Sequence, residues 1–185
     1  FQQNGKSVIS MPGVPYEMKG MMSDEILPSI QQENNITIYH KTICTQGIGE
    51  SWLAEKIEDI ENELPSYIKL AYLPAPAQVR LRLSAYGAAK ESELNAFLNK
   101  IVERVGDYVY GFDTDTLPVV LGRILKEKGK TLAVAESCTG GYISHLITSV
   151  AGSSAYFKGA VVAYANEIKV NQLGVENSVL QSEGA

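Results

Sequence analysis

Histidine, cysteine and tryptophan are scarce in this chain, which has two, two and one of them among its 185 residues. His40 and His145 lie in different parts of the sequence, so no metal site can be assembled from a recognisable spacing. Cys44 and Cys138 form neither a CxxC pair nor a disulfide framework. We therefore expect no bound metal and a reducing, cytoplasmic location.

Positive charge and long apolar runs are also lacking. Lysine and arginine number 16 against 21 aspartates and glutamates, which gives a net charge of −5. This balance does not favour a general binder of nucleic-acid phosphates, and we expect no nucleic-acid partner. No stretch approaches the roughly 20 apolar residues that span a bilayer, and no basic region followed by an apolar one opens the chain. We therefore expect no membrane partner.

The chain does have an ordinary globular composition, with 45 % hydrophobic and 20 % charged residues. Its length allows one large domain or two small ones, either of which could bury a core. Because Phe1 is not an initiator and small residues close the chain, we expect a fragment that is cut at both ends.

The first expected unit, residues 1–33, is typical of a strand, a turn and a helix. Residues 7–11 are strand-like, and a proline and a glycine follow them as turn residues. Pro15 suits the first turn of the helix, in which methionines recur at helical spacing. A methionine stripe of this kind indicates packing rather than ligand binding.

The second expected unit, residues 36–112, alternates strand and helix periodicity. Its expected elements are a strand from Ile36, a helix over 53–64, strands over 68–73 and 79–86, a helix over 94–105 and a short strand at 108–110. This order predicts an α+β sandwich of two helices on a small sheet.

The third expected unit, residues 113–185, alternates strands and helices. Its expected elements are a helix from Leu117 capped by Thr116, a strand over 131–135, a helix at about 140–150, a strand at about 159–164 and a helical start near Glu167. The alternation predicts an α/β domain, of which we expect only the N-terminal part to be present.

The strand-to-helix turn in this unit, residues 135–141, reads AESCTGG and carries two hydroxyls and a thiol. A helix that begins at the two glycines would aim unpaired backbone N–H groups at whatever lies beside Ser137. Such a turn suits a nucleophile, and Cys138 is the rival to Ser137. With Tyr164 and Lys169 downstream, a Ser-Lys type hydrolase is one hypothesis. From the residues alone, capping of the helix by Ser137 is the stronger one.

Four linked motifs extend the pattern, namely AESCTGG, GSSAYFKG, VVAYANEIK and LGV. In this order they resemble the C-terminal domain of the CinA (competence/damage-inducible) family over residues 117–185. The resemblance implies a nicotinamide mononucleotide (NMN) amidase. PGVPYEM, at residues 12–18, resembles the closing motif of the molybdopterin-binding-like N-terminal domain of that family, and the middle unit resembles its KH-type module.

The resemblance also implies a Ser-Tyr-Lys catalytic set at Ser137, Tyr164 and Lys169. Ser137 would attack the carboxamide of NMN, and Lys169, with Tyr164, would take its proton and return one to ammonia. Lysines are almost fully charged at neutral pH, so such a base needs desolvation or a positive neighbour. The reaction gives nicotinate mononucleotide and ammonia, and no metal or other cofactor is implied for it.

The other implied residues surround this set. The substrate would be held by the backbone N–H groups of Thr139, Gly140 and Gly141 at the oxyanion, by Ser153 and Ser154 at the phosphate, and by Asn166 at the ribose or amide. Glu136 would orient Lys169 or pair with an arginine, and Cys138 would pack inward.

Two alternative functions stay open. The resemblance of PGVPYEM points to a nucleotide-sugar (ADP-ribose type) pyrophosphatase in the N-terminal domain, which would need a divalent metal. A non-catalytic nucleic-acid-binding or assembly module would instead use the KH-like unit, whose family clamps nucleic acid with a GxxG loop. Residues 47–50 have the wrong spacing for that loop, and six acids within 50–63 would repel a phosphate backbone. We expect a small nucleotide as substrate, a homo-oligomer, and no turnover by this chain alone.

Overall fold

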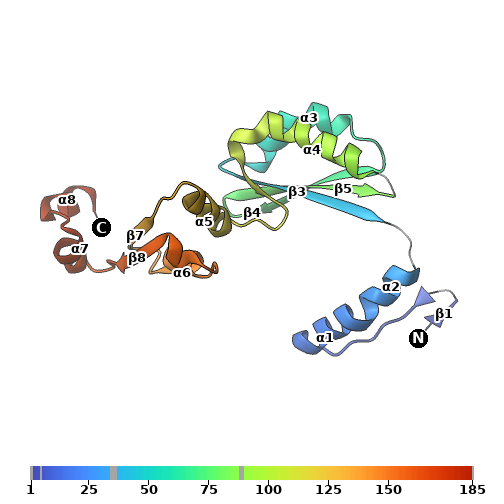
Figure 1. Cartoon of the computed structure of the whole chain (residues 1–185), viewed down its shortest axis with the longest axis horizontal. Coiled ribbons are helices and arrows are strands. Elements are labelled where there is room, and N and C mark those ends of the chain that lie inside the picture. The colour runs from blue at the N-terminus through green and yellow to red at the C-terminus, as the bar shows by residue number, and fades with distance from the viewer. Residues whose placement is uncertain (1, 5, 34–36, 88–89, 185) are drawn as a thin grey trace.

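A computed structural model describes residues 2–4, 6–33, 37–87 and 90–184 of the chain. Its elements group into an N-terminal helical segment, an antiparallel sheet covered by two helices, and a parallel strand pair flanked by helices (Figure 1). No helix in these ranges is both long and apolar enough to cross a membrane.

The N-terminal segment is a short hairpin followed by a continuous run of helix. It consists of β1 (Gln2–Gln3), β2 (Lys6–Ser7), α1 (Pro15–Met21), the π-helical turn η1 (Met22–Ile26) and α2 (Leu27–Glu33). Pro15 lies in the first turn of α1, as predicted. Pro28 lies inside the helical run, where its missing N–H disrupts the regular ladder, and the π-helical turn directly before it accommodates that break. The strand predicted over residues 7–11 is wrong, because β2 ends at Ser7 and residues 8–12 have no regular secondary structure.

The central unit is a four-stranded antiparallel sheet with the strand order β4-β5-β3-β6. Its elements are β3 (Ile38–Gln46), α3 (Glu50–Asn62), β4 (Ile68–Ala75), β5 (Gln78–Tyr86), α4 (Glu91–Val105), the 3-10 turn η2 (Gly106–Tyr108) and β6 (Val109–Phe112). Both helices cover the same face of the sheet (Figure 1), so the predicted α+β sandwich is confirmed. Ile36, where the sequence predicts the first strand to begin, lies outside the described residues.

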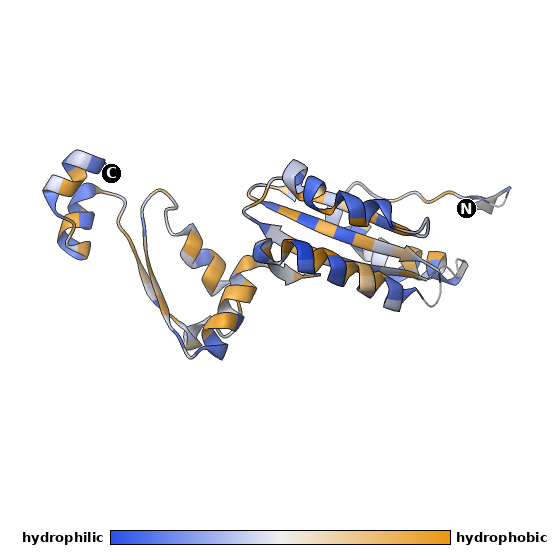
Figure 2. Cartoon of the chain, turned by 90° about the horizontal axis from the view of Figure 1, so that it is seen from above, coloured by the Kyte–Doolittle hydropathy of each residue, from blue (hydrophilic) through white to orange (hydrophobic). Residues whose placement is uncertain are grey.

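Alternation along the strands divides this sheet into a buried face and an open face. On β5, Leu81 and Leu83 are buried against the helices, whereas Arg80 and Arg82 lie on the opposite face. The helices contribute Leu53, Ile57 and Ile60 from α3 and Leu94, Ile101 and Val105 from α4. Figure 2 shows the same division as alternating apolar and polar residues along the long strands and around the helices.

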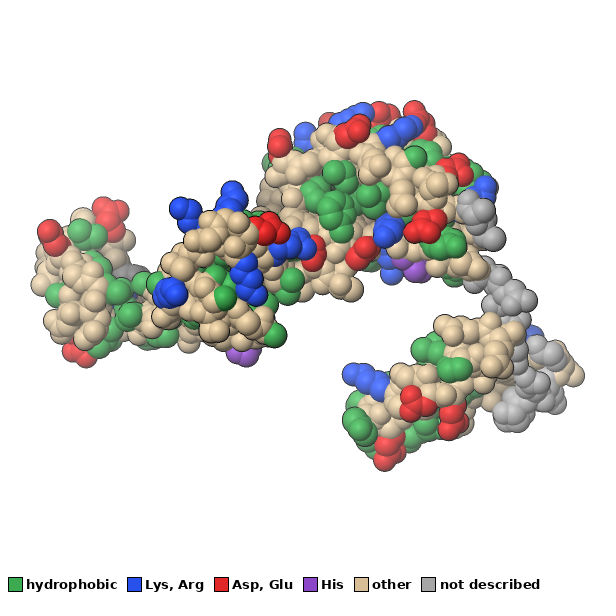
Figure 3. Space-filling view, in the orientation of Figure 1, with side chains coloured by type: hydrophobic (Ala, Val, Ile, Leu, Met, Phe, Trp, Pro, Cys, Tyr) green, Lys and Arg blue, Asp and Glu red, His purple; other side chains and the backbone are tan. Residues whose placement is uncertain are grey.

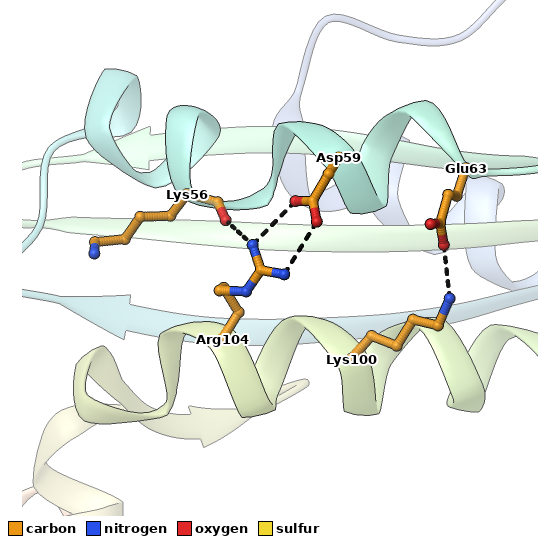
Figure 4. Close-up of polar contacts among 5 residues, drawn as sticks. All are labelled: Lys56, Asp59, Glu63, Lys100 and Arg104. Carbon is orange, nitrogen blue, oxygen red and sulfur yellow. Dashed lines mark hydrogen bonds and ion pairs between the residues drawn. The ribbon is translucent and has the colours of Figure 1, made fainter.

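Ion pairs join α3 and α4 at the surface. Arg104 donates two hydrogen bonds of 3.0 Å to the Asp59 carboxylate and one of 2.9 Å to the carbonyl of Lys56 (Figure 4). The hydrogen bonds from Arg104 lower the pKa of the Asp59 carboxyl. The ammonium nitrogen of Lys100 lies 2.7 Å from a carboxylate oxygen of Glu63. Because these groups stay exposed among many other surface charges (Figure 3), the pairs align the helices more than they stabilise the fold.

The last unit is built on a parallel strand pair. Its elements are α5 (Leu117–Glu127), β7 (Leu132–Glu136), α6 (Tyr142–Thr148), the 3-10 turn η3 (Ser153–Ala155), β8 (Phe157–Val162), α7 (Asn166–Leu173) and α8 (Asn177–Glu183). The predicted α/β alternation is confirmed, since α6 connects two parallel neighbours. Thr116 occupies the position before α5 but makes no side-chain capping bond.

One tight contact and one open apolar surface characterise this unit. Tyr156 is buried against α5, where a Cβ added to Gly122 would lie 2.5 Å from the Tyr156 hydroxyl oxygen. Several apolar side chains nevertheless stay exposed, among them Leu117, Leu121, Ile124, Ile143, Val161 and Val162. An apolar pocket of about 310 Å³ opens between α5, β7 and α6.

Replacement of Leu81 by alanine tests the assignment of β5 to the core. Leu81→Ala should lower the free energy of unfolding by about 2–5 kcal/mol, because it leaves a cavity at a fully buried site. Leu73→Ala on β4, where the side chain is 38 % exposed, is the matched control and should change that energy by about 0.5 kcal/mol at most. Urea unfolding measures both, and equal losses would contradict the assignment.

Replacement of Gly122 tests the packing of α5. Gly122→Ala should destabilise the protein by about 1–3 kcal/mol through overpacking against Tyr156, although alanine is the better helix former. Gly20→Ala in α1, where the space beside an added Cβ is open, should not destabilise it. Thermal unfolding distinguishes the two variants, and a melting temperature raised by both would show that Tyr156 does not pack against α5.

Candidate functional site

The turn between β7 and α6 has the backbone conformation that its two glycines allow. Gly140 and Gly141 have φ angles of +57° and +95°, in the left-handed region that other residues avoid. Ser137 is half-buried at the start of the turn, and Cys138 and Thr139 are exposed. The expectation that Cys138 packs inward is therefore wrong, because Cys138 lies in the turn itself and is exposed to solvent.

Glu136, at the end of β7, is buried and accepts hydrogen bonds from the first turn of α6. Its carboxylate accepts the N–H groups of Gly141 at 3.0 Å, Ile143 at 3.0 Å and Ser144 at 2.9 Å, and also the Ser144 hydroxyl. The expectation that Glu136 orients Lys169 or pairs with an arginine is wrong, since the helix N-terminus supplies its partners.

The charge of Glu136 is maintained by these bonds. Burial by itself would raise the pKa of the Glu136 carboxyl, but the hydrogen bonds from Ser144, Thr139 and Ile143 outweigh burial and lower the pKa to about 2. The carboxylate is therefore ionised throughout the physiological pH range, and its charge meets the positive end of the α6 dipole.

Occupation of the α6 N-terminus changes which N–H groups can bind an oxyanion. The N–H of Gly140 donates to the Ser137 carbonyl at 3.0 Å, and that of Gly141 donates to Glu136. The expectation that both groups are unpaired is wrong, while a substrate-binding role for the two glycines stays a prediction. Within the described ranges, the N–H groups of Cys138 and Thr139 make no hydrogen bond, so they are the donors left beside Ser137.

Ser137 and Tyr164 both follow the carboxyl ends of neighbouring strands, β7 and β8, so they lie at the same edge of the sheet. Glu136 is paired with Val162, and the N–H of Ala163 donates to the Glu136 carbonyl at 2.7 Å. Carboxyl ends of neighbouring parallel strands meet at one edge, which is where ligands bind in open α/β sheets. Tyr164 lies two residues beyond the end of β8 rather than inside the predicted strand, and it is 73 % exposed.

Lys169 and Asn166 lie on the helix that follows this edge. The ammonium of the half-buried Lys169 donates to the Asn166 side-chain oxygen at 3.3 Å, one turn earlier on α7. In the part of the chain that the structure describes, no hydrogen bond joins Ser137, Tyr164 and Lys169. The parallel pairing of β7 and β8 therefore places Ser137 and Tyr164 at the same end of the strand pair. That Lys169 joins them in one catalytic site stays a prediction.

Ser153 and Ser154 are separated from that edge. They lie in η3, before the amino end of β8, whereas Ser137 follows the carboxyl end of β7. A strand as long as β8 spans about 20 Å, so the two serines lie at the opposite edge of the parallel pair. Their phosphate-binding role stays a prediction, but within a single chain these serines do not lie beside Ser137.

Two residues of this turn differ from the expectation, since Glu136 has other partners than predicted and Ser144, which donates to it, was not predicted to take part. An acid at the end of a strand that turns into a helix is a recognisable signal, because carboxylates are favourable at the positive end of the helix dipole. Ser144 could be recognised only once the helix start was known. Elsewhere in the described ranges, no group of three or more histidine, cysteine or acidic residues could hold a metal ion.

Two family models match this chain. The model of the CinA C-terminal domain matches residues 114–185, and the model of the damage-inducible protein CinA KH domain matches residues 40–111. A CinA-like protein of Cytophaga hutchinsonii is 48 % identical over 189 residues, which cover 100 % of this chain and 45 % of that protein. A CinA-like protein of Flavobacterium psychrophilum is 51 % identical over 180 residues, which cover 95 % of this chain and 43 % of that protein.

A solved structure is also similar. It is the crystal structure of the competence/damage inducible protein CihA from Agrobacterium tumefaciens, with 38 % identity and a TM-score of 0.37 over 37 % of this chain and 42 % of that chain. The chain spans less than half the length of the curated relatives described above.

Thiol labelling tests the geometry of the turn. Cys138 should react quickly with a thiol reagent at pH 7–8, because it is exposed. Burial raises the pKa of the Cys44 thiol, which leaves less reactive thiolate at a given pH, so Cys44 should react only slowly. Cys138→Ala should abolish the fast phase and Cys44→Ala should retain it. A fast phase that survives in Cys138→Ala would contradict this arrangement.

Proposed function

This chain belongs to the CinA family, and on that basis we propose that residues 113–185 belong to an amidase domain that hydrolyses NMN to nicotinate mononucleotide and ammonia. The match of residues 114–185 to the CinA C-terminal domain supports this assignment. The observation that carries it is the shared edge of β7 and β8, at which Ser137 and Tyr164 leave adjacent parallel strands. Lys169 lies on the helix that begins three residues before it, directly after that edge.

The proposed reaction has two halves. The hydroxyl of Ser137 bonds to the carboxamide carbon, its proton passes to the amine of Lys169 through Tyr164, and the C–N bond then breaks as ammonia leaves with that proton. Water next attacks the resulting ester, giving up a proton by the same route. As the ester C–O bond breaks, the proton held by Lys169 returns through Tyr164 to the Ser137 oxygen, which restores the serine and releases the carboxylate.

The base of this mechanism needs a neutral amine. A nucleotide bound over the exposed Tyr164 would exclude water from the neighbourhood of Lys169. Lys169 is half-buried, and its ammonium donates to the side-chain oxygen of Asn166 at 3.3 Å.

The oxyanion would be held by backbone N–H groups at the exposed side of the turn. Those of Thr139 and Cys138 are adjacent to Ser137 and are not used by α6. Donors fixed in a turn of defined conformation cost little reorganisation as the charge develops. We propose Thr139 as the first of these donors.

The amidase proposal also includes the partner, the cofactor requirement, the location and the oligomeric state of the protein. The partner would be a small nucleotide, bound without a metal or other cofactor, in a cytoplasmic homo-oligomer that contacts neither membrane nor nucleic acid. The open apolar surface of α5 and β8 supports burial of this unit against further protein.

Conversion of NMN by the full-length natural protein tests the proposal, in the presence of a chelator. Ser137→Ala should reduce kcat by about 1,000-fold or more, because the attacking atom is lost. Cys138→Ala, one residue along, is the matched control and should retain activity. Loss of activity in Cys138→Ala alone would assign the nucleophile to the thiol. Absence of conversion by the unaltered protein would refute the amidase.

A further inference from the structure

Glu136 directly precedes the proposed nucleophile and is only 2 % exposed. We infer that Glu136 is a positioning residue, whose carboxylate ties α6 to the end of β7 and so holds the turn that carries Ser137. The inference rests on the proposed amidase function, because the position of Ser137 matters to a reaction only if Ser137 reacts.

Three elements meet at this single residue. The backbone carbonyl of Glu136 accepts the N–H of Ala163 at 2.7 Å, which fixes the end of β7 to the chain leaving β8. Its side chain accepts the N–H groups of Gly141, Ile143 and Ser144, which fixes the start of α6. Ser137 lies between these two attachments, so the direction of its side chain depends on both.

The chemistry of this position requires a carboxylate. Three backbone N–H groups and the Ser144 hydroxyl all donate to it, and an ionised carboxylate offers about four acceptor sites and no donor. A glutamine of the same shape would present an NH₂ group to these donors and leave some of them unpaired. A buried N–H group without an acceptor is costly, so the first turn of α6 would open.

Opening of the first turn of α6 would lower kcat rather than weaken binding of the nucleotide. The turn has two glycines in the left-handed region, which give it no conformational stiffness of its own once α6 is released. Displacement of a nucleophile by about 1 Å can reduce a rate by about 100-fold. Binding of the nucleotide, through groups beyond the turn, should change much less.

Glu136→Gln in the full-length natural protein provides the test, with the exposed acid variant Glu127→Gln as the control. In the folded Glu136→Gln protein, kcat for NMN should fall by about 100-fold with little change in KM. Ser144→Ala removes one donor to the same carboxylate and should reduce kcat in the same direction by less. Should Glu136→Gln fail to fold, Ser144→Ala carries the test. A folded variant with unchanged kcat, or with a loss confined to KM, would overturn the inference.

Amide hydrogen exchange separates this inference from the proposed function. The amides of Gly141, Ile143 and Ser144 should exchange faster in Glu136→Gln, while that of Leu81 in the central unit stays unchanged. If the unaltered protein does not convert NMN, the amidase fails, and this exchange still decides whether Glu136 holds the turn. Unchanged exchange at the three amides would overturn the positioning role in either case.

Discussion

A buried carboxylate needs hydrogen-bond donors, and the first turn of an α-helix has N–H groups that lack acceptors. In this chain the Glu136 carboxylate accepts hydrogen bonds from the N–H groups at the start of α6, and the geometry of the candidate site follows from these bonds. They fix the crossover between β7 and β8, determine which way the chain runs after Ser137, and leave the exposed N–H groups of Cys138 and Thr139 as donors. The glycines allow this turn, but the carboxylate selects its conformation.

The central unit and the last unit differ in how completely they bury their apolar side chains. In the central unit, the alternating residues of β5 and the apolar stripes of α3 and α4 close a continuous core, and charged groups remain at the surface. In the last unit, the parallel pair has one covered face, and apolar side chains of α5 and β8 stay exposed beside a pocket of about 310 Å³. In this unit the hydrogen bonds to Glu136 join the end of β7 to the start of α6.

Local periodicity was sufficient to predict much of this fold. The alternation at 79–86 predicts β5 because a half-buried strand repeats every two residues, and the spacing of Leu53, Ile57 and Ile60 predicts one face of α3. The failures have a different cause. The apolar residues after Ser7 resemble a strand, but β2 ends there, since local hydrophobicity does not determine where a strand stops. The exposure of Cys138 depends on a turn that the glycines permit without specifying. The separation of Ser153 and Ser154 from Ser137 follows from the parallel pairing, which motif order along the chain does not express.

Charge compensation at α6 also limits how a nucleotide can be bound. The N-terminus of a helix attracts phosphate through its unpaired N–H groups and its positive dipole end. Here Glu136 uses those N–H groups and offsets that charge, so α6 offers little attraction to a phosphate. The ionised carboxylate more than offsets the roughly half-unit positive charge of a helix N-terminus, so an anion gains no attraction from α6. In the proposed amidase, the phosphate of the nucleotide would then be bound by groups outside α6, while the N–H groups beside Ser137 would meet the charge that develops on the carboxamide oxygen.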